Sequence, residues 1–339
     1  MGKTSLRIGI NGMGRIGRTI LREWALRRPE GIEIVACNNP GAPDNYVHLL
    51  TYDSVHGVYP GTIHLEGNTL RIDGKDLTFF DEKNPSEIPW AERGVETVVD
   101  ATGIFRDKKA LASHLKDSVK KVIMCAPGKD LDATFVMGVN HESYDPKTHH
   151  IVSNASCTTN CLAPLAKVLD EGFGIEAALM NTVHAYTLDQ MTLDSAHKDK
   201  RRARAAGLNM IPTSTGAAAM VGEVIPHLLG KFDGGAVRVP TPDVSLVDLT
   251  VHLSGSPSLS SINEAMEEAA SSSLKGILAY SDRPLVSQDF RGRRESSIYD
   301  APLTKIVGPL AKLSAWYDNE VGFSNRVIDL AMFMGSKRG

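Results

Sequence analysis

The sequence predicts an α/β protein in two parts: a doubly wound, mainly parallel sheet in the first half, and an α+β second half with a mainly antiparallel sheet. Two observations predict this division. Up to about residue 156, short apolar runs alternate with helix-periodic stretches, which is the order of βαβ units. Beyond that point the chain carries long strand runs such as Asp243–Leu253, where apolar and polar residues alternate as on a sheet with one buried face.

Length and composition place the chain among ordinary globular proteins. Its 339 residues are enough for two domains with separate cores. A hydrophobic content of 42% and a charged content of 23% are typical of such proteins, and the net charge of −3 does not indicate nucleic acid or an anionic membrane as the main partner. No apolar run has the length of a membrane span, and the start of the chain carries no targeting pattern.

The cysteines indicate a reducing compartment. The four residues Cys37, Cys125, Cys157 and Cys161 are too few and too scattered for a disulfide framework, so a cytoplasmic location is expected. Cys157 and Cys161 could share one helix face, but no further Cys or His stands close by at ligand spacing. No metal site is therefore expected.

A glycine-rich loop follows the first strand-like run, residues 6–11. The loop reads GMGRIG (residues 12–17), a helical stripe covers Arg18–Arg28, and a second strand-like run covers Ile32–Cys37. This order is a dinucleotide-binding fingerprint: the first glycine allows the tight turn, the second lets the backbone approach the pyrophosphate, and the third lets helix and strand pack closely. The diphosphate then lies at the helix N-terminus.

The second strand ends without the acidic residue that usually bonds the adenosine ribose. The stretch Cys37–Gly41 reads CNNPG, with Asn39 near the expected place. A carboxylate there would repel the 2′-phosphate of NADP, whereas an amide would not. The alternative is that Asn39 merely caps a turn before Pro40.

Two further strand-like runs, residues 96–102 and 121–126, flank a helix-like segment, residues 108–115. Ligands of doubly wound sheets bind at the carboxyl ends of the strands. This rule places near the cofactor the residues Asn11, Asn38, Asn39, Thr102, Gly103 and Cys125.

The segment around Cys157 is the candidate catalytic centre. A β-prone run, residues 149–154, leads into it, and helical apolar spacing follows from Leu162 to Leu169. Cys157 is therefore expected at a helix N-terminus, where unpaired N–H groups and the helix dipole favour a thiolate. The alternative is a small buried cysteine without chemistry.

The second half supplies possible partners for this cysteine. Residues 175–186 read as a strand that contains His184, although lone histidines are usually structural. Residues 187–209 read as an ordered polar loop for function or subunit packing, and its basic run, Lys198–Arg204, suits phosphate. Thr213–Gly216 is expected to start a helix running to Ile225, with hydroxyl and N–H groups suited to an anion.

The remaining elements of the second half follow from local patterns. Residues 235–253 give two strand runs broken at Pro240 and Pro242. A capping box at Ser261–Glu264 is expected to open a helix. A strand is expected at Lys312–Tyr317 and a final amphipathic helix at Phe323–Met334.

The stretch SNASCTTNCLAPLAKVL, residues 153–169, closely resembles the active-site signature of glyceraldehyde-3-phosphate dehydrogenases. Other motifs match in family order and spacing along essentially the whole chain: INGMGRIGR, YDSVHG, MGVNH, TVHAYTLDQ, RRARAA, IPTSTGAA, VRVPTPDVS, LKGILAYSDRPLVS and AWYDNEVGFSNRVIDLA. The resemblance implies a Rossmann domain (residues 1–156), a catalytic domain (157–320) and a C-terminal helix (321–339) that packs back on the first domain. It also implies a homotetramer, with the loop after His184 at a subunit interface near a neighbour's cofactor.

The resemblance also implies roles for individual residues. Cys157 matches the nucleophile, and His184 its general base and later acid. The inorganic-phosphate site matches Ser156, Thr158, Thr215 and Gly216, with Arg202 near by. The site for the substrate's C3 phosphate matches Thr187, Asp189 and Arg238. The cofactor contacts match Gly12, Gly14, Arg15, Ile16 and Gly17 at the pyrophosphate and Asn319 at the nicotinamide carboxamide.

The implied reaction is the oxidation of glyceraldehyde 3-phosphate to 1,3-bisphosphoglycerate through a cysteine thioester, with NAD or NADP as the hydride acceptor. The chain departs from the common NAD-specific form at three places: Asn39 replaces Asp, Ser195-Ala196 replaces Leu-Pro, and Lys200 stands where Leu is common. These changes remove a carboxylate and add space and hydroxyl groups, so NADP is expected to be accepted. The alternative is a set of neutral changes in an NAD enzyme, and the glycolytic or anabolic direction stays open.

Two other functions are alternatives to this interpretation of the sequence. Erythrose-4-phosphate dehydrogenase shares the cysteine signature but typically lacks the Tyr-Thr pair after the histidine and the TSTG loop, both intact here as Tyr186-Thr187 and Thr213–Gly216. A non-enzymatic role in RNA binding through the dinucleotide groove is opposed by the net charge and by the complete active-site pattern.

Overall fold

The computed structural model describes residues 5–338, which divide into two compact units. The first unit contains the chain up to Phe135, residues His141–Ala155 and the C-terminal part from Ser324. The second contains Val136–Asn140 and Ser156–Phe323. Each unit is built on one large sheet.

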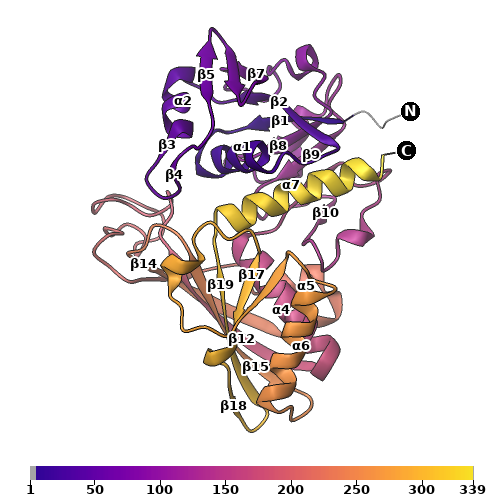
Figure 1. The fold of residues 1–339 in the computed structure, drawn as a ribbon, viewed down its shortest axis with the longest axis vertical. Helices are drawn as coiled ribbons and strands as arrows, with labels where there is room; N and C mark the ends of the chain where they lie inside the picture. Colours follow the sequence, from indigo (N-terminus) through magenta and orange to yellow (C-terminus); the bar gives the residue numbers. More distant parts are fainter. Residues whose placement is uncertain (1–4, 339) are drawn as a thin grey trace. The chain divides into compact units, whose positions relative to one another are not determined.

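Within the described residues, the first unit has a nine-stranded sheet in the order β10-β11-β9-β8-β1-β2-β7-β6-β5 (Figure 1). The parallel strands are β1 (Leu6–Asn11), β2 (Ile32–Asn38), β7 (Lys75–Phe80), β8 (Thr97–Asp100), β9 (Lys121–Met124), β10 (Ala133–Thr134) and β11 (Ile151–Ser153). The antiparallel strands β5 (Ile63–Glu66) and β6 (Thr69–Ile72) extend the edge beyond β7. The central strands are almost wholly buried, as a sheet covered on both faces requires. The predicted doubly wound sheet is confirmed.

The helices of this unit are α1 (Arg15–Arg27), α2 (Pro43–Thr51), α3 (Lys108–Leu111) and α7 (Val321–Ser336), which begins in the second unit. Short 3₁₀ segments lie at Trp90–Arg93, Ala112–His114 and His141–Ser143, and β3 (Tyr52–Asp53) pairs with β4 (Gly57–Val58). The single helix predicted over residues 108–115 is wrong in length. After Leu111 the α-helix changes to a 3₁₀ segment. There the Ser113 hydroxyl donates to the Ala110 carbonyl at 2.6 Å and competes with the backbone hydrogen bonds of an α-helix.

The C-terminal helix is tied to the first helix of the fold by an ionic network. Arg27 donates to Asp329 at 2.7 Å and to the side chain of Asn325 at 2.8 Å, and Asn325 donates to Glu23 at 2.9 Å. These bonds hold the part of α7 that follows Phe323 against α1 within the first unit (Figure 1).

Within the described residues, the second unit has an eight-stranded sheet in the order β13-β14-β12-β15-β19-β17-β16, with β18 paired to β19. The strands are β12 (Ile175–Ala185), β13 (Ile211–Ser214), β14 (Phe232–Val239), β15 (Ser245–Leu253), β16 (Leu278–Ser281), β17 (Ser297–Asp300), β18 (Lys305–Val307) and β19 (Leu310–Tyr317). Only the β12–β14 and β16–β17 pairs are parallel among these described pairings. The prediction of a mainly antiparallel second sheet is confirmed.

The helices of the second unit are α4 (Cys157–Phe173), α5 (Val221–Val224) and α6 (Leu259–Ser271), with 3₁₀ segments at Pro226–Leu228, Ser287–Phe290 and Ala301–Leu303. The helix predicted to run from Thr213–Gly216 to Ile225 is present only as the short α5, and its predicted start is wrong. Thr213 and Ser214 belong to β13, whose backbone pairs with Ala236 and Gly235 of β14, so these residues cannot also open a helix. The capping box predicted at Ser261 is displaced as well, because Ser258 is the N-cap and its Oγ accepts from the Ser261 N–H at 3.1 Å.

One face of the second sheet is covered by α4 and α6, which also pack on each other (Figure 1). On the other face alternate side chains of β12 stay open, and Leu179 is 67% exposed. Among residues 5–338, no helix combines the length and the apolar character that crossing a membrane requires.

Candidate active site

Cys157 is the first residue of α4, as predicted. Ser156 caps the helix, and its Oγ accepts from the Thr159 N–H at 2.9 Å. The cysteine is free and partly exposed, whereas residues 158–166, which follow it in the helix, are buried. The local sequence therefore presents one thiol at the start of a helix whose first turns belong to the core.

The structure brings His184 to this thiol. Its Nε2 lies 3.6 Å from the Sγ of Cys157, and the ring is only 4% exposed. Strands β12 and β14 pair so that His184 stands beside Arg238, whose Nη1 lies 2.7 Å from Nδ1. The carbonyl of Ala185 also lies 2.7 Å from Nδ1. These two contacts require opposite tautomers, because the carbonyl needs a proton on Nδ1 whereas a guanidinium can only donate to Nδ1. A base role for Nε2 requires the proton on Nδ1, and Arg238 then donates to the Ala185 carbonyl at 3.0 Å.

Electrostatics make this a pair of neutral groups. Burial, reinforced by the Arg238 charge, lowers the pKa of His184 to about 3, so the imidazole is uncharged at neutral pH. Burial raises the pKa of the Cys157 thiol, against the opposing effects of Arg238 and of hydrogen bonds from Thr158. The expectation that the helix start would favour a thiolate is not met, because the desolvation of the sulfur outweighs it. Both shifts oppose proton transfer in the resting pair, so the contact suits transfer of the thiol proton to the imidazole as the sulfur attacks a carbon.

Tyr317 of β19 supports both members of the pair and was not predicted from the sequence. Its hydroxyl lies 2.8 Å from Oγ1 of Thr158 on α4 and 2.8 Å from Oγ1 of Thr182 on β12. Its ring centroid is 5.9 Å from that of His184. The sequence placed it in a strand run and in the motif AWYDNEVGFSNRVIDLA, neither of which indicated a polar contact.

In the first unit, the glycine loop fits a dinucleotide diphosphate. Gly12 has φ of +96°, and a Cβ there would lie 2.7 Å from the Thr102 nitrogen. A Cβ on Gly17 would lie 1.9 Å from the Gly12 oxygen, whereas one on Gly14 would meet no atom within 4 Å. Helix α1 starts at Arg15 with no side-chain cap. Its first N–H groups, next to the open space at Gly14, are suited to phosphate oxygens.

Comparison with known proteins identifies the family of this chain. A family model described as "Glyceraldehyde 3-phosphate dehydrogenase, NAD binding domain" matches residues 6–108, and the corresponding "C-terminal domain" model matches residues 156–319. Glyceraldehyde-3-phosphate dehydrogenase 1 of Bacillus cereus is 53% identical over 332 residues, which cover 98% of this chain and 99% of that protein. The Geobacillus stearothermophilus glyceraldehyde-3-phosphate dehydrogenase is 51% identical, again over 98% and 99% of the two chains. The chain belongs to the glyceraldehyde-3-phosphate dehydrogenase family.

Of the residues expected at the phosphate sites of this dehydrogenase family, Asp189 contacts Arg202. Its Nη1 forms an ion pair with Asp189, its Nε donates to Thr213 Oγ1 at 2.9 Å, and its Nη2 donates to the Ser214 carbonyl at 3.1 Å. Arg202 thus joins the polar loop to the strand before Thr215 and Gly216. Thr215 accepts from the Ala217 N–H at 3.2 Å.

Two further residues expected at the phosphate sites, Thr187 and Arg238, form no hydrogen bond with Arg202 within the part of the chain that the structure describes. The Thr187 N–H donates to Gln190 at 2.8 Å, which closes the turn at the start of the loop. The buried Nε of Arg238 has no hydrogen-bond partner among the described residues. A buried guanidinium N–H without a partner is costly, and an anion oxygen is one acceptor suited to it.

The residues expected along the cofactor in this dehydrogenase family have distinct surroundings. Gly14, Arg15 and Ile16 are partly exposed, and Arg15 donates to Asp53 at 2.9 and 3.2 Å. Asp100, itself bonded by Asn11 at 2.9 Å, accepts from the Thr102 hydroxyl at 2.7 Å. The neighbouring positions Gly103 and Cys125 are respectively exposed and partly exposed, and burial raises the pKa of the Cys125 thiol.

Asn39 holds the glycine loop. Its Oδ1 accepts from the Met13 N–H at 2.8 Å, while its Nδ2 donates to the Pro40 carbonyl at 3.0 Å and to the Tyr46 hydroxyl. The alternative that Asn39 merely caps a turn before Pro40 therefore describes only part of its bonding.

Two expected cofactor residues lie in the second unit. The Asn319 Oδ1 accepts from the Ser245 hydroxyl at 2.8 Å, which itself accepts from the Ala185 N–H at 3.1 Å, next to His184. This leaves the Asn319 amide N–H₂ as a possible donor to a carboxamide. Ser195 is exposed in the polar loop, and its expected role concerns the cofactor of a second chain.

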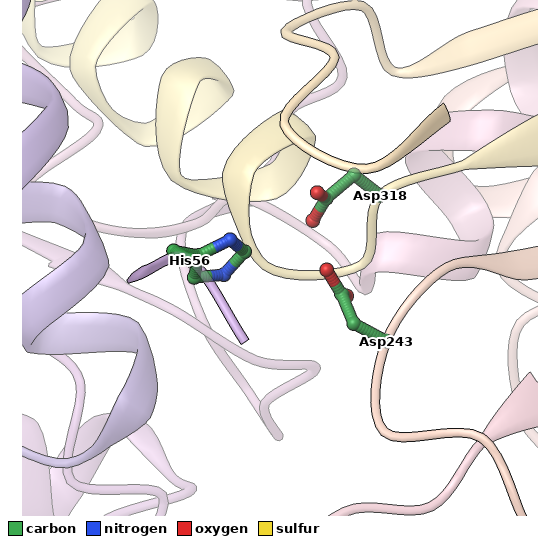
Figure 2. Close-up of side chains that lie close together, drawn as sticks. All are labelled: His56, Asp243 and Asp318. Atoms are coloured by element: carbon green, nitrogen blue, oxygen red, sulfur yellow. The ribbon is translucent and has the colours of Figure 1, made fainter. Parts of the chain in front are cut away.

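Asp318, the neighbour of Asn319 in the sequence, lies close to a second carboxyl group, that of Asp243. Figure 2 shows the carboxyl groups of Asp243 and Asp318 turned towards each other, with oxygens within 4.8 Å. Both are buried, at 4% and 1% exposure. Burial, with the charges of Asp318 and Glu320, raises the pKa of Asp243 to about 9. Asp318 accepts the N–H groups of Glu320 and Val321, at the start of α7, so Asp243 is the member that holds the proton.

Proposed function

We propose that this chain catalyses the phosphorylating oxidation of glyceraldehyde 3-phosphate to 1,3-bisphosphoglycerate. The observation that carries the proposal is the contact of 3.6 Å between the Cys157 thiol and a neutral His184 imidazole at the start of α4. A neutral imidazole is the form that can accept a proton, and a thiol is the group that can conserve oxidation energy as a thioester.

The steps follow from these two residues. The Sγ of Cys157 bonds to the aldehyde carbon while the thiol proton passes through His184 Nε2 to the aldehyde oxygen, which gives a hemithioacetal. His184 then takes the hydroxyl proton as the carbon is oxidised. The bound nicotinamide supplies the oxidising power by accepting hydride. Inorganic phosphate attacks the resulting thioester, the Cys157 thiolate leaves, and His184 returns the proton to it.

The anion sites are assigned by the same proposal. The buried, unpartnered Nε of Arg238 supports binding of the C3 phosphate, together with Thr187 and Asp189. The inorganic phosphate is assigned to Ser156, Thr158, Thr215 and Gly216, with the positive charge of Arg202. The ion pair with Asp189 limits that charge, so phosphate binding is expected to loosen the pair.

For the cofactor, the match to an NAD-binding domain establishes the dinucleotide class. Gly12, Gly14 and Gly17 fit the diphosphate, and Arg15, Ile16 and Asn319 are assigned to the pyrophosphate and the carboxamide. We propose that NADP is accepted as well as NAD, because Asn39 places no carboxylate at the end of β2. The test is kcat/KM with each cofactor at saturating phosphate; a preference for NAD above roughly a hundredfold, about 2.7 kcal/mol, contradicts acceptance of NADP.

The domain roles and the assembly are part of the proposal. Residues 1–156, with 321–339 packing back on them, form the cofactor domain, and residues 157–320 form the catalytic domain. A homotetramer is supported by the open face of the second sheet and by apolar side chains on and after the polar loop: Leu188 is 83%, Leu208 82% and Met210 76% exposed. Sedimentation at four times the chain mass of 36.6 kDa tests this. A cytoplasmic location is supported by the need to keep Cys157 reduced.

The alternatives weighed from the sequence are not favoured, because the family models and relatives carry the glyceraldehyde-3-phosphate dehydrogenase name. Steady-state assays with glyceraldehyde 3-phosphate and with erythrose 4-phosphate, each with and without inorganic phosphate, test the proposal. We expect faster, phosphate-dependent cofactor reduction with glyceraldehyde 3-phosphate. Higher kcat/KM with erythrose 4-phosphate, or rates independent of phosphate, would overturn it.

A further inference from the structure

The neighbour of β2 in the sheet brings an acidic residue to the place where β2 lacks one. Strands β2 and β7 run parallel with Asn38 beside Phe80. The ladder continues past the strand ends, because the Asn39 N–H donates to the Phe80 carbonyl at 3.1 Å. The next pair in this register is Asn39 and Asp81. Asp81 therefore lies at the carboxyl end of the sheet, next to the residue expected at the adenosine ribose.

A hydrogen bond fixes the Asp81 carboxylate towards this loop. Its Oδ1 accepts from the Gly41 N–H at 2.7 Å, two residues beyond Asn39. Both polar atoms of the Asn39 amide already form hydrogen bonds: Oδ1 accepts from Met13, and Nδ2 donates to Pro40 and Tyr46. Of these two neighbouring side chains, Asp81 is the charged one, and it is exposed to solvent.

We propose that Asp81 is a specificity-determining residue for the cofactor: it supplies from β7 the negative charge that β2 lacks, and so makes the site prefer NAD over NADP. This inference rests on the proposed use of nicotinamide dinucleotides and deepens it. NADP is accepted because no carboxylate occupies position 39, and it is disfavoured because a carboxylate stands one strand away.

The expected size of the effect follows from simple electrostatics. A 2′-phosphate carries nearly two negative charges, and one carboxylate at a separation of several ångströms in a wet site weakens its binding by about tenfold. Because Asp81 is exposed, salt will screen the repulsion. NAD, which has a neutral hydroxyl at this position, feels no such repulsion.

The test is direct binding of each cofactor to Asp81→Asn by calorimetry, without glyceraldehyde 3-phosphate. The amide oxygen of asparagine can still accept from the Gly41 N–H, so the variant removes charge and keeps the loop contact. The matched control is Asp117→Asn, which makes the same charge change just before β9, at the amino ends of the parallel strands. We expect NADP to bind Asp81→Asn about tenfold more tightly at low salt, with the gain shrinking at high salt, and NAD to change by less than about twofold.

Three results would overturn the proposal. An unchanged ratio of the two dissociation constants would show that the Asp81 charge is not felt at the 2′ position. An equal change for both cofactors would assign Asp81 to loop positioning. An equal gain in NADP affinity in Asp117→Asn would show that the effect comes from the net charge of the protein and not from the position of Asp81. Phosphate-dependent oxidation of glyceraldehyde 3-phosphate with NAD should persist in both variants, so a failure here is distinct from a failure of the proposed reaction; wild-type protein that binds neither cofactor would overturn both.

Discussion

The Nε2 of His184 lies 3.6 Å from the sulfur of Cys157, although Cys157 is the first residue of α4 and His184 is the last but one of β12. On the other side of the ring, Nδ1 lies 2.7 Å from the Ala185 carbonyl, which also accepts from Arg238 of the adjacent strand at 3.0 Å. Because burial and Arg238 keep the imidazole neutral, the pair rests as thiol and base. This relationship governs the first three predictions.

Replacing the nucleophile should abolish turnover. Cys157→Ser exchanges the thiol for a hydroxyl that His184 cannot ionise, so no thioester forms, and we expect no phosphate-dependent cofactor reduction in a steady-state assay. The control is Cys161→Ser, one helical turn away, where the sulfur is buried beside the Ser297 hydroxyl. The control should keep activity. Near-normal phosphorylating activity of Cys157→Ser would show that Cys157 is not the nucleophile.

Removing the base should slow the chemistry and leave cofactor affinity intact. His184→Asn cannot take the thiol or hydroxyl proton, and loss of general base catalysis costs roughly a hundredfold to ten-thousandfold in kcat. Calorimetric binding of NAD should match the wild type. A fall in affinity with kcat unchanged would instead assign His184 to binding.

The reactivity of Cys157 should rise steeply with pH. Burial raises its pKa and His184 stays neutral, so below that pKa the thiolate fraction grows about tenfold with each pH unit. We expect the rate of alkylation by iodoacetamide, followed by mass spectrometry of the Cys157 peptide, to keep rising through neutral pH without a plateau. A plateau below neutral pH would show a thiolate–imidazolium pair in the resting protein.

Tyr317→Phe should lower stability. The change leaves the buried hydroxyls of Thr158 and Thr182 without their shared partner, which costs about 1–3 kcal/mol. Denaturant unfolding measures the loss, and Tyr52→Phe, at a residue that is 55% exposed, is the control. An equal effect of the two changes would show that the Tyr317 bridge does not stabilise the fold.

Asp243→Asn should make stability less dependent on pH. The folded pKa of Asp243, about 9, lies above the ordinary value, so the folded chain holds a proton that the unfolded chain releases. The stability this proton gives is fully present below about pH 4, the unfolded pKa, and is lost as pH rises towards 9. Asparagine has no proton to lose.

The measurement is Tm at pH 5 and pH 9. The gap between Asp243→Asn and wild type should widen with pH in favour of the variant, whereas Asp282→Asn, at an exposed aspartate, should follow the wild type. A constant difference in Tm between the variant and the wild type across this range would mean that the proton on Asp243 does not contribute to stability.

The sequence correctly predicted the features that depend on neighbours along the chain. The strand–glycine loop–helix order, the start of α4 at Cys157 and the alternating strand β15 follow from short-range periodicity and capping. Prediction from the sequence failed where pairing with a distant segment competes with the local pattern. Thr213 and Ser214 resemble the start of a helix, but in the structure their backbone pairs with β14.

The tertiary structure alone decided the chemistry of the site. The distance from Cys157 to His184, the register that sets Arg238 beside that histidine, and the register that sets Asp81 beside Asn39 all depend on which strands pair. The protonation of the thiol was decided there too, because desolvation depends on everything packed around the sulfur, whereas the helix start that favours a thiolate is a local feature. Local patterns specify elements; the pairing and burial of distant segments specify distances and charges.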